Sequence, residues 1–299
     1  MKKQTLFLLS TALLLTGCQQ VGTNIEKADQ PIMTIGSTTY TKGDEYSLLK
    51  HSSGAKMSVE LIRQAIMDKE IKRTDEIKKE AEKQYDQLAQ NNPDIETQLQ
   101  QAGYKDKTEY IDKVLIPSVQ SNKLIDTYFI DAKEKIKKEY KPSLVKIIQC
   151  DDEKTAQKAL DAYKDGVELD KIYEEYASPS ATYTNQDTLI TTSSTDLPTR
   201  LINTMAKQKK AGIANEIFKM EDNETATTAY VAILVNNNYD NILEQIKQNL
   251  STDSTISTQA FAYFLEKYNF EVHDQFVFDY LKANNPEYLY QYPELTEDK

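Results

Sequence analysis

The chain has 299 residues, of which 39% are hydrophobic and 28% charged, with 8 glycines and 8 prolines. This composition supplies apolar material for about two packed domains, and it excludes wholesale disorder and collagen-like or other low-complexity classes. The 36 basic residues are outnumbered by 47 acidic ones, giving a formal charge of -11, which disfavours binding to nucleic acid. Because there are only 2 cysteines and 2 histidines, a disulfide framework is excluded, and we expect no metal and no cofactor.

The first 17 residues have the pattern of an export signal. Two lysines precede an apolar run from Leu6 to Leu15, which is shorter than the ~20 residues of a membrane span and fits a secretory signal. The run ends in Leu15-Thr16-Gly17-Cys18, which resembles the lipobox of bacterial lipoproteins. The resemblance implies that residues 1–17 are removed and that Cys18 carries diacylglycerol, so that the mature chain is anchored to the membrane without spanning it. Cys150 is then a free thiol.

Residues 18–30 are polar and predict a flexible tether. β-favouring residues around Gly36-Ser37 then predict a strand and turn over residues 31–44. Helical spacing of apolar residues fills most of the region up to residue 140, which makes 31–140 an N-terminal helical region. Pro117 lies inside the last of these helices, and we expect a break there because an interior proline costs ~3 kcal/mol.

A different pattern begins after Lys141-Pro142. Its segments alternate in type, in the order strand (144–150), helix (153–164), helix (169–176), loop (178–194), helix (197–207), strand (212–220) and strand (230–235). This order predicts an α+β domain over residues 142–237.

Helical spacing returns over residues 240–268 and is followed by a short extended piece at 270–272. We expect residues 238–283 to pack on the N-terminal helical region, because an amphipathic helix has to bury its apolar face. The tail, residues 284–299, is expected to fray. The predicted fold class is therefore α+β, with a helical module formed by the N- and C-terminal segments and an α+β domain inserted between them.

Several blocks of residues, taken in their order, resemble the PrsA-type foldase lipoproteins of Gram-positive bacteria. They are the lipobox, Ile32–Gly36 with Thr41–Glu45, the run from Glu153 to Ser178, Tyr230–Val235, Tyr239–Leu250 and Phe270–Val272. The resemblance implies a SurA-like helical region and a parvulin (rotamase) domain at 142–237. Parvulin domains can catalyse peptidyl-prolyl isomerisation, which otherwise takes tens to hundreds of seconds and can limit folding.

The residues that this resemblance would make catalytic are replaced. Active parvulins carry one histidine on the first strand and one on the last, and these positions fall on Lys146, within one residue, and on Val231. A phenylalanine position on the third helix falls on Ala206. His51 and His273 are the histidines of the chain, and both lie outside the domain. We therefore expect no catalytic residues and a domain that keeps the fold but loses most catalysis, because only groups that favour the twisted X–Pro bond accelerate the reaction.

Other candidate residues have simpler structural explanations. The acidic cluster Asp151-Asp152-Glu153 is expected at a helix N-terminus, where negative charge is favourable. Cys150 has no histidine nearby to lower its pKa, and His51 is expected in an exposed loop. A non-standard site near Cys150 or Asp187 stays open. The role of the tail tyrosines also stays open, either as a peptide-binding patch or as part of a disordered end; these are Tyr288, Tyr290 and Tyr292.

The sequence thus predicts a foldase or chaperone for unfolded exported proteins, lipid-anchored at the outer face of the cytoplasmic membrane of a Gram-positive bacterium. A cradle built from residues near 31–140 and 240–283 would hold clients by weak, promiscuous apolar contacts, and a homodimer through this module is compatible with the sequence. Two alternatives remain: an active peptidyl-prolyl isomerase with a non-standard site, and a solute-binding lipoprotein. The long helical stretch disfavours the second, because that class alternates strands and helices in two lobes.

Overall fold

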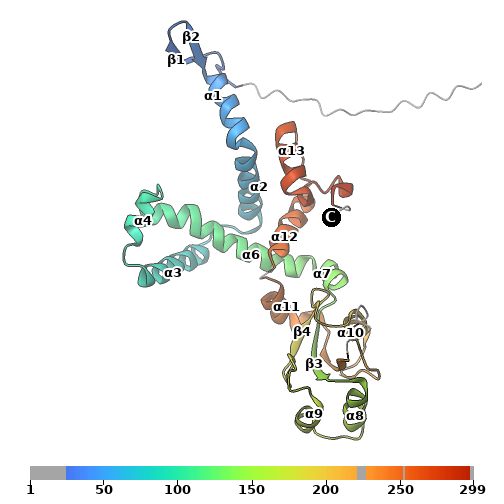
Figure 1. Cartoon of the computed structure of the whole chain (residues 1–299). Coiled ribbons are helices and arrows are strands. Elements are labelled where there is room, and N and C mark those ends of the chain that lie inside the picture. Colours follow the sequence, from blue (N-terminus) through green and yellow to red (C-terminus); the bar gives the residue numbers. More distant parts are fainter. Residues whose placement is uncertain (1–24, 221–226, 252, 297–299) are drawn as a thin grey trace, which may run out of the picture. The chain divides into compact units, whose positions relative to one another are not determined.

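The computed structural model describes residues 25–220, 227–251 and 253–296 (Figure 1). The fold is mixed α+β, as predicted, and it divides into two compact units. The first unit joins the two ends of the chain, up to Ile66 and from Phe264 onward, and the second holds Met67–Tyr263. The boundaries predicted near residues 140 and 238 both fall inside the second unit and stay predictions. The predicted signal segment and Cys18 lie outside the described residues.

The described part of the first unit begins with a two-stranded antiparallel hairpin. Strands β1 (Pro31–Ile35) and β2 (Thr38–Thr41) are joined by a two-residue turn. Gly36 occupies the first turn position with a φ of 60°, a left-handed conformation that costs glycine least. The strand and turn predicted over residues 31–44 are therefore confirmed up to Thr41, whereas residues 42–44 begin a helix.

A continuous helical segment follows β2. Thr41 caps helix α1 (Lys42–Leu49): its hydroxyl accepts a hydrogen bond from the Asp44 amide, and the Asp44 carboxylate accepts one from the Thr41 amide. A π-helical segment, η1 (Lys50–Gly54), leads into α2 (Ala55–Glu70). The loop predicted around His51 is thus wrong, although its side chain is exposed as expected.

The C-terminal part of the first unit contains the end of α12 (Ser254–Lys267), helix α13 (Gln275–Asn284) and two short 3-10 turns, η4 (Pro286–Tyr288) and η5 (Pro293–Leu295). Residues 270–272 belong to no helix and no strand, so the short extended piece stays a prediction. The fraying predicted for the tail is also wrong over its described residues, because Tyr288 and Leu289 are buried.

The two ends of the chain contact each other inside the first unit, as the predicted fold requires. Lys50 Nζ lies 2.6 Å from Asp274 Oδ2, and Asp274 also accepts hydrogen bonds from the backbone amides that start α13. Further along α2, Arg63 Nε donates to the Tyr288 hydroxyl at 3.1 Å. A buried tyrosine needs such a partner for its hydroxyl, and this hydrogen bond links the turn at Tyr288 to α2.

The second unit begins with a group of helices. The elements are α3 (Asp75–Asn91), α4 (Ile95–Gln101), α5 (Lys107–Tyr110), π-helical η2 (Ile111–Leu115), α6 (Ile116–Asp131) and α7 (Lys133–Tyr140). The buried residues of a shared apolar cluster come from α3, α4, η2 and α6. Pro117 is the second residue of α6, a position where a missing amide hydrogen matters least. The predicted break is therefore not an interruption of the helix: the chain stays helical, and the π-helical segment η2 runs directly into α6.

The chain returns to these helices after the sheet, through η3 (Tyr239–Ile242), α11 (Leu243–Leu250) and α12. The buried Tyr239 hydroxyl donates to the Phe129 carbonyl at 2.7 Å, and the Tyr140 hydroxyl donates to Gln259 Oε1 at 3.0 Å. The helix predicted over residues 240–268 thus exists in pieces, with a gap between α11 and α12.

A four-stranded antiparallel sheet forms the rest of the second unit. Its strand order is β4-β3-β6-β5, with β3 (Ser143–Cys150), β4 (Thr188–Ile190), β5 (Gly212–Ile213) and β6 (Ala229–Asn236). Helices α8 (Glu153–Lys164) and α9 (Leu169–Tyr176) pack on one face, and α10 (Thr199–Lys207) packs on the other (Figure 1). The predicted element order is confirmed, except that β4 lies in the predicted loop and that the strand predicted over 212–220 shrinks to β5 plus a bridge between Phe218 and Tyr230.

Substitution of Asp274 tests the contact between the chain ends. We expect Asp274→Ala to lower the stability of α13 by roughly 1–2 kcal/mol, because a helix cap and an ion pair are both lost; Asp274→Asn, which can still cap, should cost less. The Lys50 hydrogen bond lowers the pKa of Asp274 from its ordinary value of 3.8. A lowered folded-state pKa gives stability that is present above the ordinary value and lost as the pH falls below it. Hydrogen exchange of the α13 amides at neutral and acid pH measures both effects, and a difference that persists undiminished in acid would contradict the assignment.

The tail tyrosines provide a matched pair. Tyr288 is fully buried whereas Tyr292 is 38% exposed. We expect Tyr288→Ala to lower the free energy of unfolding by about 3 kcal/mol and Tyr292→Ala by less than about 1 kcal/mol. Denaturant unfolding followed by circular dichroism measures this, and equal effects would argue against a fixed tail.

Candidate functional site

The sheet is the first candidate, because the predicted catalytic positions fall on β3 and β6. Successive side chains of a strand point to opposite faces. Val231 belongs to the buried cluster under α8 and α9 together with Ile148 and Cys150, and Lys146 shares the face of Ile148. The positions of Lys146 and Val231 are therefore on the α8/α9 face, where no imidazole is present.

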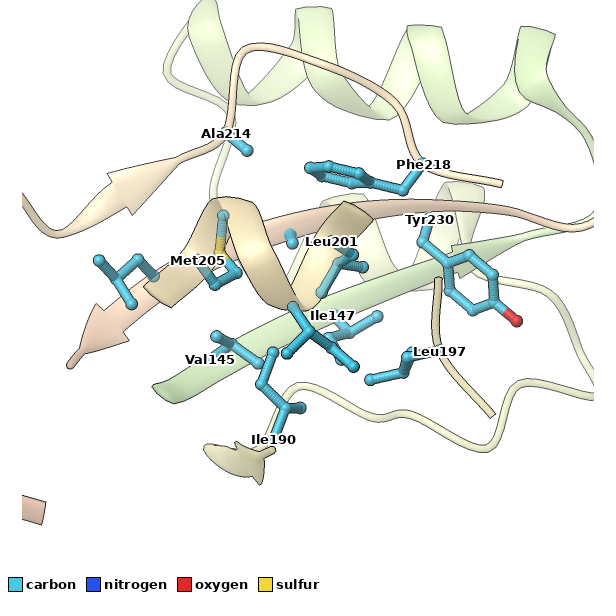
Figure 2. Packing of buried hydrophobic residues seen from close by; sticks show 12 residues of the cluster. Val145, Ile147, Ile190, Leu197, Leu201, Met205, Ala214, Phe218 and Tyr230 are labelled. Atoms are coloured by element: carbon cyan, nitrogen blue, oxygen red, sulfur yellow. The ribbon is translucent and has the colours of Figure 1, made fainter. Parts of the chain in front are cut away.

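The α10 face offers no catalytic pair either. A shift of one residue from Lys146 reaches Ile147, which is paired with Ala232 on β6. Both are buried in one cluster with Leu201 and Met205 of α10. Figure 2 shows these helix side chains lying over β3, with Phe218 beside them. The cluster members are at most 6% exposed, so the face is filled by packing. His51 and His273 both belong to the first unit.

Lys146 has a structural role. Its ammonium group donates to the Asn185 carbonyl at 3.0 Å and lies 3.1 Å from Asp187 Oδ1. The Asn185 side chain in turn donates to the carboxylate of Asp170 on α9. Lys146 therefore fastens the loop before β4 to the sheet and neutralises Asp187, the residue around which a non-standard site was left open.

One polar pair that sequence reasoning missed lies at the rim of the α10 face. The Tyr183 hydroxyl donates to Asp196 Oδ2 at 2.5 Å, and its ring packs against the buried cluster. Burial raises the pKa of Tyr183 above its ordinary value, and the Asp196 carboxylate raises it further, so the phenol stays a hydrogen-bond donor at neutral pH. No local motif marks this pair, because both residues lie in a stretch rich in Ser and Thr.

Cys150 and the acidic residues after it serve the fold. Burial, with a smaller effect of Asp151 and Asp152, raises the pKa of the Cys150 thiol to about 12, and a nucleophilic cysteine needs the opposite shift. Asp152 Oδ1 accepts a hydrogen bond from the Thr155 amide at 2.7 Å and so caps α8. The interpretation of the acidic cluster as a helix N-terminus is confirmed.

The second candidate is an apolar surface in the first unit. Large hydrophobic side chains are exposed along the hairpin, α1 and the start of α2; they are Ile32, Met33, Ile35, Tyr40, Tyr46, Leu48, Leu49, Met57 and Leu61. Part of this surface, together with Asp44 and Glu45, lines a hollow of about 600 Å³ between the hairpin and α1. Scattered exposed hydrophobic residues are common, but a contiguous group of them indicates an interaction site.

Within residues 25–220, 227–251 and 253–296, no three His, Cys, Asp or Glu side chains are grouped as a metal site requires. No helix in that part of the chain is long and apolar enough to cross a bilayer.

Comparison with known proteins finds similarity at the level of structure. No family model matches the chain, and no curated protein matches it. Among solved structures, it is similar to the peptidylprolyl isomerase PrsA of Bacillus cereus (20% identity, TM-score 0.49, covering 86% of this chain and 99% of that one). It is also similar to the foldase protein PrsA of Streptococcus pneumoniae (17%, 0.37, 85% and 98%) and to PrsA of Bacillus subtilis (18%, 0.35, 83% and 96%). Such identities and TM-scores say nothing about the site, whose chemistry stands on the residues described above.

The reactivity of Cys150 tests its environment. In a chain that starts at Gln19, Cys150 is the sole cysteine. We expect a maleimide at pH 8 to modify it at least on the order of 100-fold more slowly in the native chain than in guanidinium, because burial excludes the reagent and suppresses the thiolate. Fast native modification would show that the α8/α9 face opens.

Proposed function

We propose that this chain is a foldase-type chaperone that holds unfolded exported proteins on the exposed apolar surface of its first unit. The observation that carries the proposal is that surface, in which Ile35, Leu48 and Leu61 are 67–70% exposed. Water-exposed apolar area is stabilised when another apolar chain covers it. Contacts of this kind depend on area and shape, which suits clients of many sequences and gives weak, reversible binding.

The proposal also includes the loss of catalysis. Rotation about an X–Pro bond is accelerated by groups that bind the twisted bond better than the planar one. Here the sheet side chains under α10 are apolar and buried, and Lys146 is engaged by Asp187. These features support a domain kept as architecture, whose helices and strands contribute no isomerase activity.

The place of action rests on the sequence of the first 24 residues. The signal-like segment and the lipobox support attachment through diacylglycerol on Cys18, at the outer face of the cytoplasmic membrane. The formal charge of -11 would keep client-loaded molecules apart and attract basic clients. Self-association through the helical module, built from residues near 31–140 and 240–283, is a further property of this proposal.

Two assays on the chain starting at Gln19 test this proposal. We expect it to suppress the aggregation of an unfolded client protein, while isomerisation of a proline peptide stays within about twofold of the uncatalysed rate. Lys146→Met should leave both results unchanged, because Lys146 is not part of the client surface. Isomerisation at the rate of an active parvulin would contradict the loss of catalysis, and a failure to suppress aggregation would contradict the chaperone role.

A further inference from the structure

We propose that the hollow between the hairpin and α1 binds an extended peptide segment whose apolar residues are flanked by lysine or arginine. This inference rests on the proposed function and gives it a substrate class and a location. The hollow, of about 600 Å³, is in the usual range for ligand sites. Its lining combines apolar side chains with acidic ones; they are Ile32, Met33, Ile35, Tyr40, Leu48, Asp44 and Glu45.

The apolar side chains of the hollow are available to a ligand. Ile35 and Leu48 are 67% and 70% exposed, and every residue of β1 is exposed. Binding therefore requires no rearrangement of a packed core, and several side chains of a client segment would cover this area together. Covering it supplies the free energy of binding.

The acidic residues of the hollow favour a ligand that carries basic residues on either side of its apolar ones. Hydrogen bonds from the amide and hydroxyl of Thr41 hold the Asp44 carboxylate in place and lower its pKa, so it is ionised at neutral pH. Glu45 also lines the hollow and adds a second acidic side chain. The neighbouring cation, Lys42, donates to the Glu26 carbonyl at 3.1 Å. The lining thus presents two carboxylates and no cation, which is complementary to a basic segment.

The hairpin favours an extended ligand. Strands β1 and β2 pair only with each other among the described strands, so the outer edge of each has backbone groups without a ladder partner. Such edges accept an additional strand, whose main chain gives affinity and whose alternate side chains enter adjacent pockets. In a segment added here, every second side chain would lie on the same face of the hairpin.

The same charges disfavour other occupants. A second copy of this chain in a twofold contact at the hollow would bring the acidic residues of the two hollows, Asp44 and Glu45, together, and like charges oppose a contact at this place. Anionic lipid headgroups would be repelled for the same reason.

Peptide binding to the chain starting at Gln19 tests the proposal. The probes are a fluorescent peptide with a central Leu-Ile-Val-Phe run flanked by lysines and a matched peptide flanked by glutamates, measured by anisotropy at low and high salt. We expect the lysine peptide to bind about tenfold more tightly at low salt, with a smaller difference at high salt. The double variant Ile35→Ser/Leu48→Ser should lose about tenfold in affinity for both peptides. Glu45→Gln should reduce the preference for lysine about threefold.

Ile130→Ser is the matched control, because Ile130 is a large exposed hydrophobic residue (59% exposed) that belongs to the second unit and lies outside the proposed client surface. It should bind both peptides as the unchanged chain does, and circular dichroism should show that all variants are folded. Equal binding of the two peptides, or equal loss in the control, would overturn the proposal. So would conversion of a dimer to a monomer by the Ile35/Leu48 variant in sedimentation, because the hollow would then be a self-contact.

The outcomes separate this proposal from the one on which it rests. If the unchanged chain suppresses client aggregation and the Ile35/Leu48 variant does so equally well, the hollow is not the site and the chaperone role stands. If the unchanged chain binds neither peptide nor client, the chaperone role itself is wrong.

Discussion

The antiparallel pairing of β3 with β6 is the constraint on which the second unit depends. It joins two strands that are far apart in the sequence, and helices cover both faces of the resulting sheet. Side chains on both faces of each strand must therefore pack against a helix, which is why β6 is apolar from Ala229 to Val235 and does not alternate. Lys146 is tolerated in β3 because its ammonium group reaches the Asn185 carbonyl and the Asp187 carboxylate.

Burial on both faces also limits what the sheet can do chemically. A catalytic group on a central strand takes the place of a packing side chain, and its polar atoms then need partners. In this chain Ile147 and Ala232, paired across the strands, are both used for packing. The polar pair of Tyr183 and Asp196 stands at the rim, where solvent can satisfy the remaining oxygen atoms. The packing that stabilises the sheet thus fills the space that a catalytic pocket would need.

In the hairpin of the first unit, by contrast, the apolar side chains are exposed. Its strands carry Ile32, Met33 and Ile35, yet no described helix covers them. The tight turn at Gly36 and the reciprocal cap between Thr41 and Asp44 hold this region in place, so its shape does not depend on burying the apolar side chains. That independence is what leaves the side chains free for a partner.

The contrast between the buried apolar side chains of the sheet and the exposed ones of the hairpin also determines what the sequence could predict. Strand β6 and helix α8 follow from local patterns, because their apolar residues are buried where the pattern places them. Strand β4 does not, because its three residues become a strand only through pairing with β3. The burial of Tyr288 depends on Arg63, 225 residues away in the chain. The hollow is missed for a different reason. Periodicity rules assume that apolar residues are buried, and they therefore do not single out residues such as Ile35 and Leu48, which stay exposed.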